Sequence, residues 1–497
     1  MLFLLVFLFF FFNSGLFAAD EFSLDQISSL FPSEGFEHGI EFWKLIFVRY
    51  SEKDAVFHDR DDLRLIYSVR SFERRRDASN AEWRRQAQAV RAEQSNLQLV
   101  LNDIARYGPN SGRLQSEHRQ IVDLLKKNGY SVSASLCKRL ANNMRHQRGI
   151  KEKFQAGLVR SGRYLSAMEA VFEQSGLPVV LALMPHVESS FDYAAYSRVG
   201  AAGMWQFMLG TGRLYDLRID GYLDERLDPL TATRAAARYL KDNYDALGTW
   251  PLALTAYNHG RNGMLRARKQ YGSDFRRIVK NYQSRSFGFA SKNFYPEFLA
   301  AVEIARNYEK YFGALPINPP LEHEIVSLDK WVHVDHCISL PEVTEDVLRD
   351  YNPQLTPQFW RGSRLLPAGL QLRVPKSHAR ELAALIEAAP AAEQYRVQSG
   401  DNLSTIARKF GISAAHLQRI NGLRNPNRIY PGQTLYVMSG APSMDRSAPK
   451  SYRVQRRDTL ISIARKFGIS LESLLNANKI PNANQIYLGQ MLLIPIG

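Results

Sequence analysis

Cysteine is nearly absent from this chain, which has only Cys137 and Cys337 among its 497 residues. Two cysteines make no disulfide framework, so we expect packed cores to stabilise the fold and both thiols to be free and buried; pairing in an oxidising compartment is the alternative. Metal-binding patterns are missing as well, because His186 and Glu188 lack the HExxH spacing that places two ligands on one helical face. We therefore predict neither a metal site nor a cofactor.

Charged residues are missing from the first nineteen positions, MLFLLVFLFFFFNSGLFAA. An apolar run of about 11 residues is short for a membrane span and is typical of a secretory signal peptide. We therefore predict a signal peptide at residues 1–19 and export to the periplasm or cell envelope. No Lys or Arg precedes the run, so an uncleaved segment with a loose membrane association is the alternative. No cysteine follows Ala19 closely enough to carry a lipid anchor.

Acidic residues are in deficit, since 49 Asp and Glu stand against 64 Lys and Arg, a net charge of +15. Such an excess favours an anionic partner such as nucleic acid, anionic lipid or an acidic polymer. The sequence has no helix-turn-helix, zinc-finger or RNP signature, and export would separate the chain from DNA. We predict no nucleic-acid partner and favour an acidic polymer outside the cytoplasm.

The length supports about three domains. Residues 20–154 are polar and arginine-rich, with apolar residues at helical steps between Val90 and Ile104, and predict a helical region packed on the unit that follows. Residues 155–315 hold the motifs described next. Residues 316–390 form a spacer before a repeated C-terminal region.

One carboxylate stands out in the stretch VESSFDYAAYSRVGAAGMWQFM, residues 187–208. The run before it, LPVVLALMPHVE, has apolar side chains at spacings that suit the buried face of a helix, so Glu188 emerges from an apolar surface. Loss of hydration disfavours the ionised form of such a carboxyl and raises its pKa, as a proton donor near neutral pH requires. A helix-terminal glutamate that meets solvent or an arginine is the plainer alternative.

An ordered series of motifs accompanies Glu188. The matching pieces are Glu188-Ser189 with Phe191, Ser197, Gly200-Ala201 with Gly203, Trp205-Gln206-Phe207-Met208, Asp228-Pro229, Ala235-Ala236-Ala237 with Tyr239-Leu240, and Ala256-Tyr257-Asn258 with Gly260. In this order and spacing, residues 155–315 resemble the lytic transglycosylases of the goose-lysozyme-like superfamily, closest to the membrane-bound type D subgroup.

The resemblance implies an α-helical lysozyme-like domain that cleaves peptidoglycan glycan strands with a single acid. Glu188 would protonate the oxygen between N-acetylmuramic acid and N-acetylglucosamine, and the muramoyl 6-hydroxyl would attack C1 to give a 1,6-anhydro product. The residues implied for substrate binding are Ser197, Met204, Gln206, Tyr257, Asn258 and Tyr295. Met204 could equally be a core residue. Tyr295 lies one position from the tyrosine of the family's Tyr-x-Pro-Lys motif, which here reads ASKNFYPEF.

No second carboxylate stands out as a nucleophile or base. Asp192 lies four residues after Glu188 and would share its face only if the helix continued through the residues between them. Asp228 precedes Pro229 in a context where helix capping is the favoured role. A hydrolytic muramidase of goose-lysozyme type is the alternative enzyme, and a catalytically silent wall-binding protein is the alternative outside enzymes.

The C-terminal third contains an internal repeat. YRVQSGDNLSTIARKFGIS begins at Tyr395 and YRVQRRDTLISIARKFGIS begins at Tyr452. Each copy predicts a short strand, an N-cap aspartate at Asp401 or Asp458, two short helices and a closing strand. The repeat therefore predicts two small units of β-α-α-β order.

Both copies resemble LysM modules, which bind N-acetylglucosamine-containing glycans. They span residues 394–438 and 451–496, with residues 439–450 as a flexible linker. The second copy departs from the family at Arg457, where a turn glycine is usual, and at Leu488, where proline is usual.

A weaker third copy lies at residues 331–375, where Tyr351-Asn352-Pro353 and LLPAGLQLRVP echo the other two. It lacks the SGD turn, and a degenerate spacer is favoured over glycan binding. The predicted fold class is therefore multidomain and mainly α: an α-helical lysozyme-like catalytic domain plus small α+β (βααβ) LysM modules. The sequence makes no prediction of oligomeric state.

Overall fold

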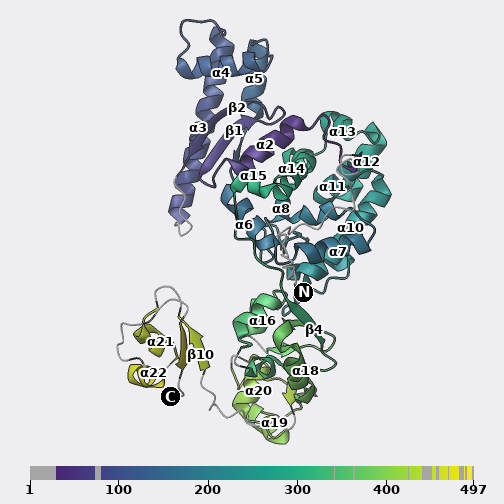
Figure 1. Cartoon of the computed structure of the whole chain (residues 1–497), viewed down its shortest axis with the longest axis vertical. Coiled ribbons are helices and arrows are strands. Elements are labelled where there is room, and N and C mark those ends of the chain that lie inside the picture. Colours follow the sequence, from purple (N-terminus) through teal and green to yellow (C-terminus); the bar gives the residue numbers. More distant parts are fainter. Residues whose placement is uncertain are drawn as a thin grey trace, which may run out of the picture. The chain divides into compact units, whose positions relative to one another are not determined.

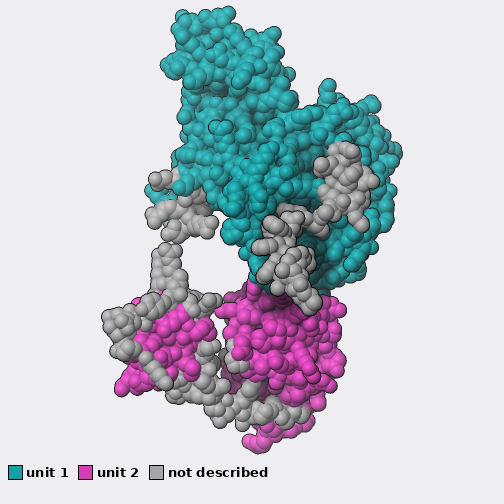
Figure 2. All heavy atoms as spheres, viewed as in Figure 1, with its two compact units in different colours: residues 1–219, 224–321 teal, residues 220–223, 322–497 magenta. Residues whose placement is uncertain are grey.

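The structure is a computed structural model that forms two compact units (Figure 2). Unit 1 comprises Met1–Ile219 and Asp224–Leu321, and unit 2 comprises Asp220–Leu223 and Glu322–Gly497. The described residues are 29–494 apart from 73–79, 341, 362–363, 424, 439–449, 455–457, 468–469, 479, 481–485 and 487–489. The predicted signal peptide, most of the linker, Arg457 and Leu488 lie outside these residues. No described helix combines the length and apolar character that a membrane crossing needs.

The motif-bearing part of unit 1 is built from helices joined by turns and loops (Figure 1). Its elements are α6 (Lys151–Ser161), α7 (Leu165–Gln174), the 3-10 helix η1 (Val179–Leu183), α8 (Pro185–Glu188), α9 (Leu209–Leu214), the 3-10 helix η2 (Glu225–Leu227), α10 (Pro229–Leu247), α11 (Trp250–His259), α12 (Arg261–Tyr271), α13 (Phe275–Asn281), α14 (Phe289–Arg306) and α15 (Tyr308–Phe312). The sequence sets the ends of α10, because the Asp228 side chain accepts from the Thr231 amide at 2.7 Å and Gly248 ends the helix at φ +79°. The predicted capping role of Asp228 is confirmed.

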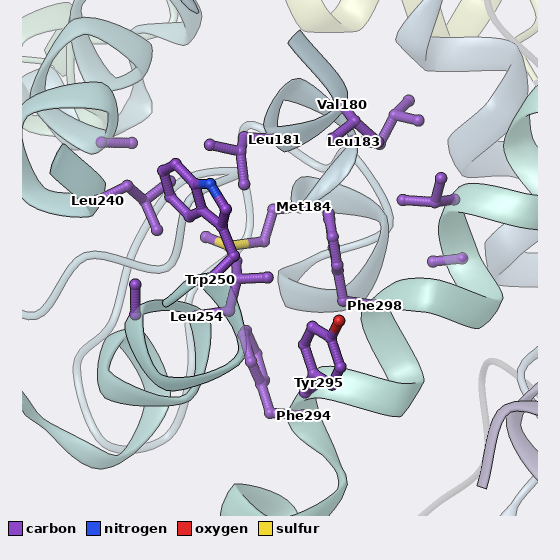
Figure 3. Close-up of a cluster of buried hydrophobic side chains, with 14 of the residues drawn as sticks. Val180, Leu181, Leu183, Met184, Leu240, Trp250, Leu254, Phe294, Tyr295 and Phe298 are labelled. Atoms are coloured by element: carbon purple, nitrogen blue, oxygen red, sulfur yellow. The ribbon is translucent and has the colours of Figure 1, made fainter. Parts of the chain in front are cut away.

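One hydrophobic core lies beneath the candidate acid. Figure 3 shows Leu181 and Met184, from the segment before Glu188, among buried side chains of α11 and α14, including Trp250 and Phe298. The predicted buried face of this segment is therefore confirmed. The segment is a 3-10 helix followed by one short α-helical turn instead of a single helix.

The N-terminal part of unit 1 shares this core. Its elements are α2 (Glu37–Val48), β1 (Asp54–Asp59), β2 (Ile66–Ser71), α3 (Asn80–Tyr107), α4 (Ser116–Lys127), α5 (Ala134–Asn143) and β3 (Met144–Arg148). Helix α2 packs closely on α14, since a Cβ added at Gly39 would lie 3.1 Å from the Pro296 side chain. Strand β1 lies between β2 and β3 in an antiparallel sheet. The prediction of a helical region missed this sheet.

Unit 2 begins with the spacer. Its elements are β4 (His323–Ser327), β5 (Val332–His333), the 3-10 helix η3 (Val334–Ser339), α16 (Glu345–Tyr351), α17 (Pro357–Arg361), β6 (Leu365–Leu366), β7 (Gln371–Pro375), the 3-10 helix η4 (Lys376–His378) and α18 (Ala379–Ala388). Strands β4 and β7 pair in antiparallel register around a separate core. Cys337 in this core and Cys137 in unit 1 are both buried and free.

Two βααβ units follow. The first has β8 (Ala392–Arg396), α19 (Leu403–Lys409), α20 (Ala414–Ile420) and β9 (Thr434–Met438), and the second has β10 (Lys450–Arg453), α21 (Leu460–Phe467), α22 (Leu471–Ala477) and β11 (Met491–Ile494). The predicted order of elements is confirmed, but the predicted N-caps are wrong. Asn402 caps α19 in a capping box with Thr405, whereas Asp401 accepts from the Tyr395 hydroxyl at 2.8 Å. Asp458 likewise accepts from the Tyr452 hydroxyl at 2.7 Å.

One asparagine in each repeat ties the second helix to the closing strand. Asn421 donates to the carbonyls of Leu417 and Tyr436 and accepts from the Tyr436 amide at 2.6 Å. Asn478 in the second repeat and Asn352 in the spacer make the same three kinds of hydrogen bond. The spacer therefore has a LysM-like junction, although its asparagine is 21 residues from the strand instead of 15.

The first repeat shares its core with the spacer. Trp331 stacks near Tyr436 with ring centroids 5.0 Å apart, and its carbonyl accepts from the Ala392 amide at 2.9 Å. Leu365 of the spacer is buried in the core of the repeat, and Arg419 pairs with Asp335 at 3.3 Å. The spacer and the first repeat therefore pack against one another across the boundary near residue 390.

This contact predicts that the spacer loses stability when the first repeat is removed. A chain that ends at residue 390 would expose Leu365 and Trp331, at a cost of at least about 1 kcal/mol. We expect the spacer to unfold at a midpoint at least about 4 °C lower in this chain than in a chain that ends at residue 438. Calorimetry measures both midpoints. Equal midpoints for the two chains would show that the repeat contributes nothing to the spacer.

Candidate active site

Glu188 is the last residue of α8, immediately before a sharp backbone turn. Ser190 and Phe191 both have φ of +54°, in the left-handed region that non-glycine residues rarely occupy. The helix therefore cannot continue, and Asp192 does not share the face of Glu188 as an extended helix would allow. Strain of this kind persists only where the surrounding structure holds it in place.

Helix α6 holds this turn. Arg160 donates from Nη2 to the Ser190 carbonyl at 2.5 Å and from Nε to the Phe191 carbonyl at 3.3 Å. Gly157 allows the close approach, because a Cβ there would lie 2.7 Å from the Ser190 carbonyl oxygen. Ser189 adds a hydrogen bond from its hydroxyl to the Met204 carbonyl at 2.9 Å. The backbone that presents Glu188 is thus fixed from two sides.

The Glu188 carboxyl is desolvated. Burial raises its pKa to about 8, and the described residues provide neither a hydrogen bond nor an ion pair to it. Its side chain nevertheless keeps partial access to solvent. His186, two residues before Glu188, packs against the rings of Phe154 and Phe191, and burial lowers its pKa to about 3. A neutral imidazole does not favour ionisation of the carboxyl, so Glu188 is protonated at neutral pH.

The glycine-rich turn after Glu188 is fixed by a buried ion pair. Arg226 and Asp224 meet at 2.7 Å, and the Arg226 guanidinium also donates to the carbonyls of Gly200 and Phe207. Gly203 has φ of +75°, and a Cβ there would lie 1.7 Å from the Arg226 carbonyl oxygen, so only glycine fits.

Two predicted binding residues lie on this turn. Gln206, with φ of +49°, donates its side-chain amide to the Gly203 carbonyl at 2.7 Å, which leaves its side-chain oxygen for another partner. The Ser197 hydroxyl accepts from the Ala201 amide at 2.9 Å and retains its own proton for donation. Both side chains are partly exposed, so both remain candidates for substrate contact.

Tyr257 lies within electrostatic reach of the acid. Its hydroxyl donates to the Trp205 carbonyl at 2.8 Å, and burial together with the charge on Glu188 raises its pKa well above the usual value. Tyr239 packs on it with ring centroids 4.9 Å apart, and the Glu188 charge also adds to the rise in the Tyr239 pKa. The sequence analysis did not assign Tyr239 to the site, although it belongs to the same motif series. Asn258 is exposed and accepts from the Ser291 hydroxyl at 2.9 Å.

Two predicted binding residues are corrected by their burial. Tyr295 has no exposed surface, donates its hydroxyl to the Pro32 carbonyl at 3.0 Å, and lies in the hydrophobic cluster of Figure 3. Met204 is 1% exposed and belongs to the same core. Neither side chain has surface to offer a substrate, because packing against the core occupies both.

A second buried carboxyl escaped the sequence analysis. Glu297 follows Pro296 on α14, and burial together with the charge on Glu188 raises its pKa well above the usual value. Two carboxyls that repel one another in a poorly hydrated site do not both ionise. Its position among buried residues (Phe294, Tyr295, Pro296 and Phe298) was the signal available in the sequence.

A cavity of about 360 Å³ adjoins Glu297. Its lining includes Ser291, the partner of Asn258, and reaches the N-terminal sheet. A larger cavity of about 460 Å³ lies at the start of α11 and includes none of the predicted site residues. Within the described part of the chain, no cluster of His, Cys, Asp or Glu could hold a metal ion.

Sequence comparison assigns these elements to known domains. Residues 168–278 match the transglycosylase SLT domain, and residues 395–437 and 452–495 match the LysM domain. The chain carries one SLT domain and two LysM domains. The resemblance to lytic transglycosylases and the fold class predicted above are both confirmed.

Several curated proteins are similar to this chain. Membrane-bound lytic murein transglycosylase D of Escherichia coli is 29% identical over 341 residues, which cover 64% of this chain and 74% of that protein. An N-acetylmuramoyl-L-alanine amidase of Staphylococcus saprophyticus is 41% identical over 107 residues, 20% of this chain and 32% of that protein. The solved lytic transglycosylase Slt of Pseudomonas aeruginosa is 18% identical, covers 40% of this chain and 29% of that one, and has a TM-score of 0.23.

The raised pKa of Glu188 predicts a pH-dependent cost to stability. Between pH 4.5 and 8 the folded state keeps a proton that the unfolded state has lost, so this group destabilises the fold progressively as the pH rises. We expect Glu188→Gln to gain on the order of 1–3 kcal/mol in unfolding free energy, relative to the wild type, between pH 5 and pH 8.5. Urea unfolding at several pH values measures this difference.

Glu173→Gln is the matched control, because Glu173 is exposed on α7. Its difference from the wild type should be flat across the same pH range. A flat difference for Glu188→Gln as well would contradict the burial of a protonated carboxyl.

Proposed function

We propose that this protein is an exported lytic transglycosylase that cleaves the β-1,4 bond between N-acetylmuramic acid and N-acetylglucosamine in peptidoglycan. The observation that carries the proposal is the Glu188 carboxyl, which stands in an SLT domain, has a pKa of about 8 and meets no ion-pair partner among the described residues. Such a group holds its proton at neutral pH and releases it readily to a leaving oxygen.

Glu188 acts twice in the proposed reaction. Its carboxyl proton passes to the glycosidic oxygen as the bond from that oxygen to the muramoyl C1 breaks. The resulting carboxylate then takes the proton of the muramoyl 6-hydroxyl while O6 forms a bond to C1. The product is a 1,6-anhydromuramoyl end, no water is consumed, and the acid is regenerated. The internal hydroxyl gains from proximity, which supports a site with one active carboxyl.

The neighbouring side chains have proposed supporting roles. Tyr257 and Tyr239 border the acid, and their aromatic rings help to exclude water from it. Gln206 and Asn258 offer amide groups to the N-acetyl groups of the sugars, and the Ser197 hydroxyl offers a donor near the scissile bond. These three side chains are accessible, in contrast to Met204 and Tyr295.

A hydrolytic muramidase is the second candidate, because Glu297 gives the site another carboxyl. A base that activates water must be ionised, yet burial raises the pKa of Glu297 well above the usual value and holds it in its neutral form. This favours internal attack over hydrolysis. The desolvated Glu188 carboxyl supports an active enzyme over a silent binding protein. The contacts that hold the turn come from Arg160, Gly157 and Ser189, so the fold of the turn does not depend on this carboxyl.

The LysM domains are proposed to hold the enzyme on the cell wall. Two modules on one chain raise the local concentration of the catalytic domain at its substrate. The net charge of +15 suits a polymer that carries carboxylates. The apolar run at residues 1–19 supports export to the periplasm or cell envelope.

Mass spectrometry of the fragments released from purified sacculi tests the proposal. We expect 1,6-anhydromuramoyl ends, each lighter by one water than a hydrolysis product, and little release from strands whose muramoyl 6-hydroxyl is O-acetylated. Glu188→Gln should lower the rate by at least about 10² to 10⁴-fold, because it removes the proton donor. Glu297→Gln should give the same anhydro products.

Ordinary reducing ends from the wild type would favour the muramidase, and their loss in Glu297→Gln would identify Glu297 as its base. Near-full activity of Glu188→Gln would contradict the assignment of the acid itself.

A further inference from the structure

The cavity beside Glu297 is built jointly by the N-terminal region and the catalytic helices. From the N-terminal region it receives Trp43 of α2 and Arg145 and Gln147 of β3. Side chains alternate across a strand, so Arg145 and Gln147 share one face of β3. His146, on the other face, meets Gln94 of α3 instead, at 3.1 Å. The catalytic helices and the loop before α14 contribute Ser286, Gly288, Phe289, Ala290, Ser291 and Glu297.

Two residues of this lining carry donors that find no acceptor among the described residues. The indole Nε1 of Trp43 and the Nε of Arg145 are both shielded from solvent without a hydrogen bond. Trp43 is only 4% exposed, so its N–H has no access to bulk water. A buried donor without an acceptor costs about 1–3 kcal/mol, and such groups are rare in folded proteins. Two of them on one cavity indicate that an acceptor from outside the chain belongs there.

Arg145 also lacks an anionic partner. Its guanidinium lies 3.9 Å from the centroid of the Phe289 ring, and the only described charge that acts on it appreciably is the like charge of Arg60. Glu297, also in the lining, is influenced by Glu188 and not by Arg145. The lining therefore holds a cation over an aromatic ring, together with an indole donor that has no acceptor among the described residues. A carboxylate is the group that fits this cation, since the guanidinium offers it a planar pair of donors.

Two residues of the cavity lining interact with residues of the candidate active site. Ser291 lines the cavity and donates to Asn258, which is proposed to contact the sugar. Glu297 lines it and senses the charge on Glu188. The cavity therefore adjoins residues that interact with the candidate site, which makes it a candidate position for a substituent of a polymer bound at Glu188.

We propose that Trp43, Arg145 and Gln147 form a subsite for a carboxylate carried by the muramoyl residue of the substrate. The proposal rests on the proposed function and extends it, because it gives the N-terminal region a direct part in substrate recognition. The carboxylate has two sources: the lactyl group of a peptide-free strand, or the stem peptide of an intact strand. Gln147 and Ser291 offer neutral polar contacts to the rest of the substituent.

Binding to the full chain carrying Glu188→Gln tests the subsite without turnover. Isothermal titration calorimetry would compare three ligands: a peptide-free muramoyl tetrasaccharide, the same tetrasaccharide with stem peptides, and an N-acetylglucosamine tetramer that has no carboxylate. We expect Arg145→Gln to weaken binding of at least one carboxylate ligand by about tenfold or more, as loss of a charge-assisted pair predicts. Binding of the neutral tetramer should change by less than about twofold.

Arg148→Gln is the matched control. Arg148 lies on the other face of the same strand, where it donates to the Lys53 carbonyl at 3.2 Å, so this variant removes an equal charge outside the cavity. It should leave all three affinities unchanged. Arg145→Lys should recover part of the affinity of Arg145→Gln, and the thermal midpoints of all the variants confirm that they fold.

The pattern of losses identifies the source of the carboxylate. Loss confined to the peptide-free ligand assigns the lactyl group, loss confined to the peptide-bearing ligand assigns the stem peptide, and loss on both assigns a site that accepts either. Unchanged affinity for both, or an equal loss for the neutral tetramer, would overturn the subsite. Either result would leave the proposed function intact if the wild type still releases anhydro fragments from sacculi.

Discussion

The burial of one carboxyl without a charged partner is the constraint on which the catalytic unit depends. Glu188 would ionise near its ordinary pKa if an arginine or several backbone amides met it, and it would then have no proton to give. The structure instead desolvates the carboxyl and fixes the turn that follows through Arg160 and Gly157. The left-handed Ser190 and Phe191 that result direct the chain away from the carboxyl. The strained turn and the desolvated carboxyl are adjacent, and both cost free energy of folding. The large hydrophobic core beneath them offsets that cost.

That core also contains side chains of both the N-terminal region and the catalytic helices, so the two parts form one packed unit. Trp43 and Phe47 of α2 are buried in it, and Lys44 on the same helix pairs with Glu303 of α14 at 2.7 Å. Helix α14 carries Glu297, so the packing of α2 on α14 helps to fix the position of the second carboxyl. A lysozyme-like domain alone would leave this face of α14 uncovered. The N-terminal sheet completes the cavity wall, which gives the region a place in recognition as well as in packing.

The parts of the fold with strong local signals could be predicted from the sequence. The caps Asp228 and Gly248, the apolar run before Glu188 and the two C-terminal repeats are local patterns, and each has its expected form. Local patterns failed where a neighbour distant in sequence decides the outcome. Strand β1 is buried at five of six positions, so it lacks the alternation that marks a strand. Asp401 resembles an N-cap, but Asn402 takes that role because Tyr395 engages the aspartate.

The same limit applies to the site. The site roles of Glu188, Tyr257, Gln206 and Asn258 stay predictions that rest on the motif series. The surface contact predicted for Tyr295 does not fit its burial, because packing against Phe36 and Phe275 depends on tertiary structure. Glu297 and Arg145 were missed because they are 152 residues apart and meet one cavity only in the folded chain.

The pH dependence of kcat/KM on a soluble muramoyl oligosaccharide tests the central claim most directly, because its alkaline limb reports the pKa of the acid in the free enzyme. Burial of Glu188 predicts a limb near pH 8, and this limb should stay in place in Glu297→Gln, since replacing a neutral carboxyl by an amide removes no charge. Activity that already falls between pH 4 and 5, as for an ordinary glutamate, would contradict the account.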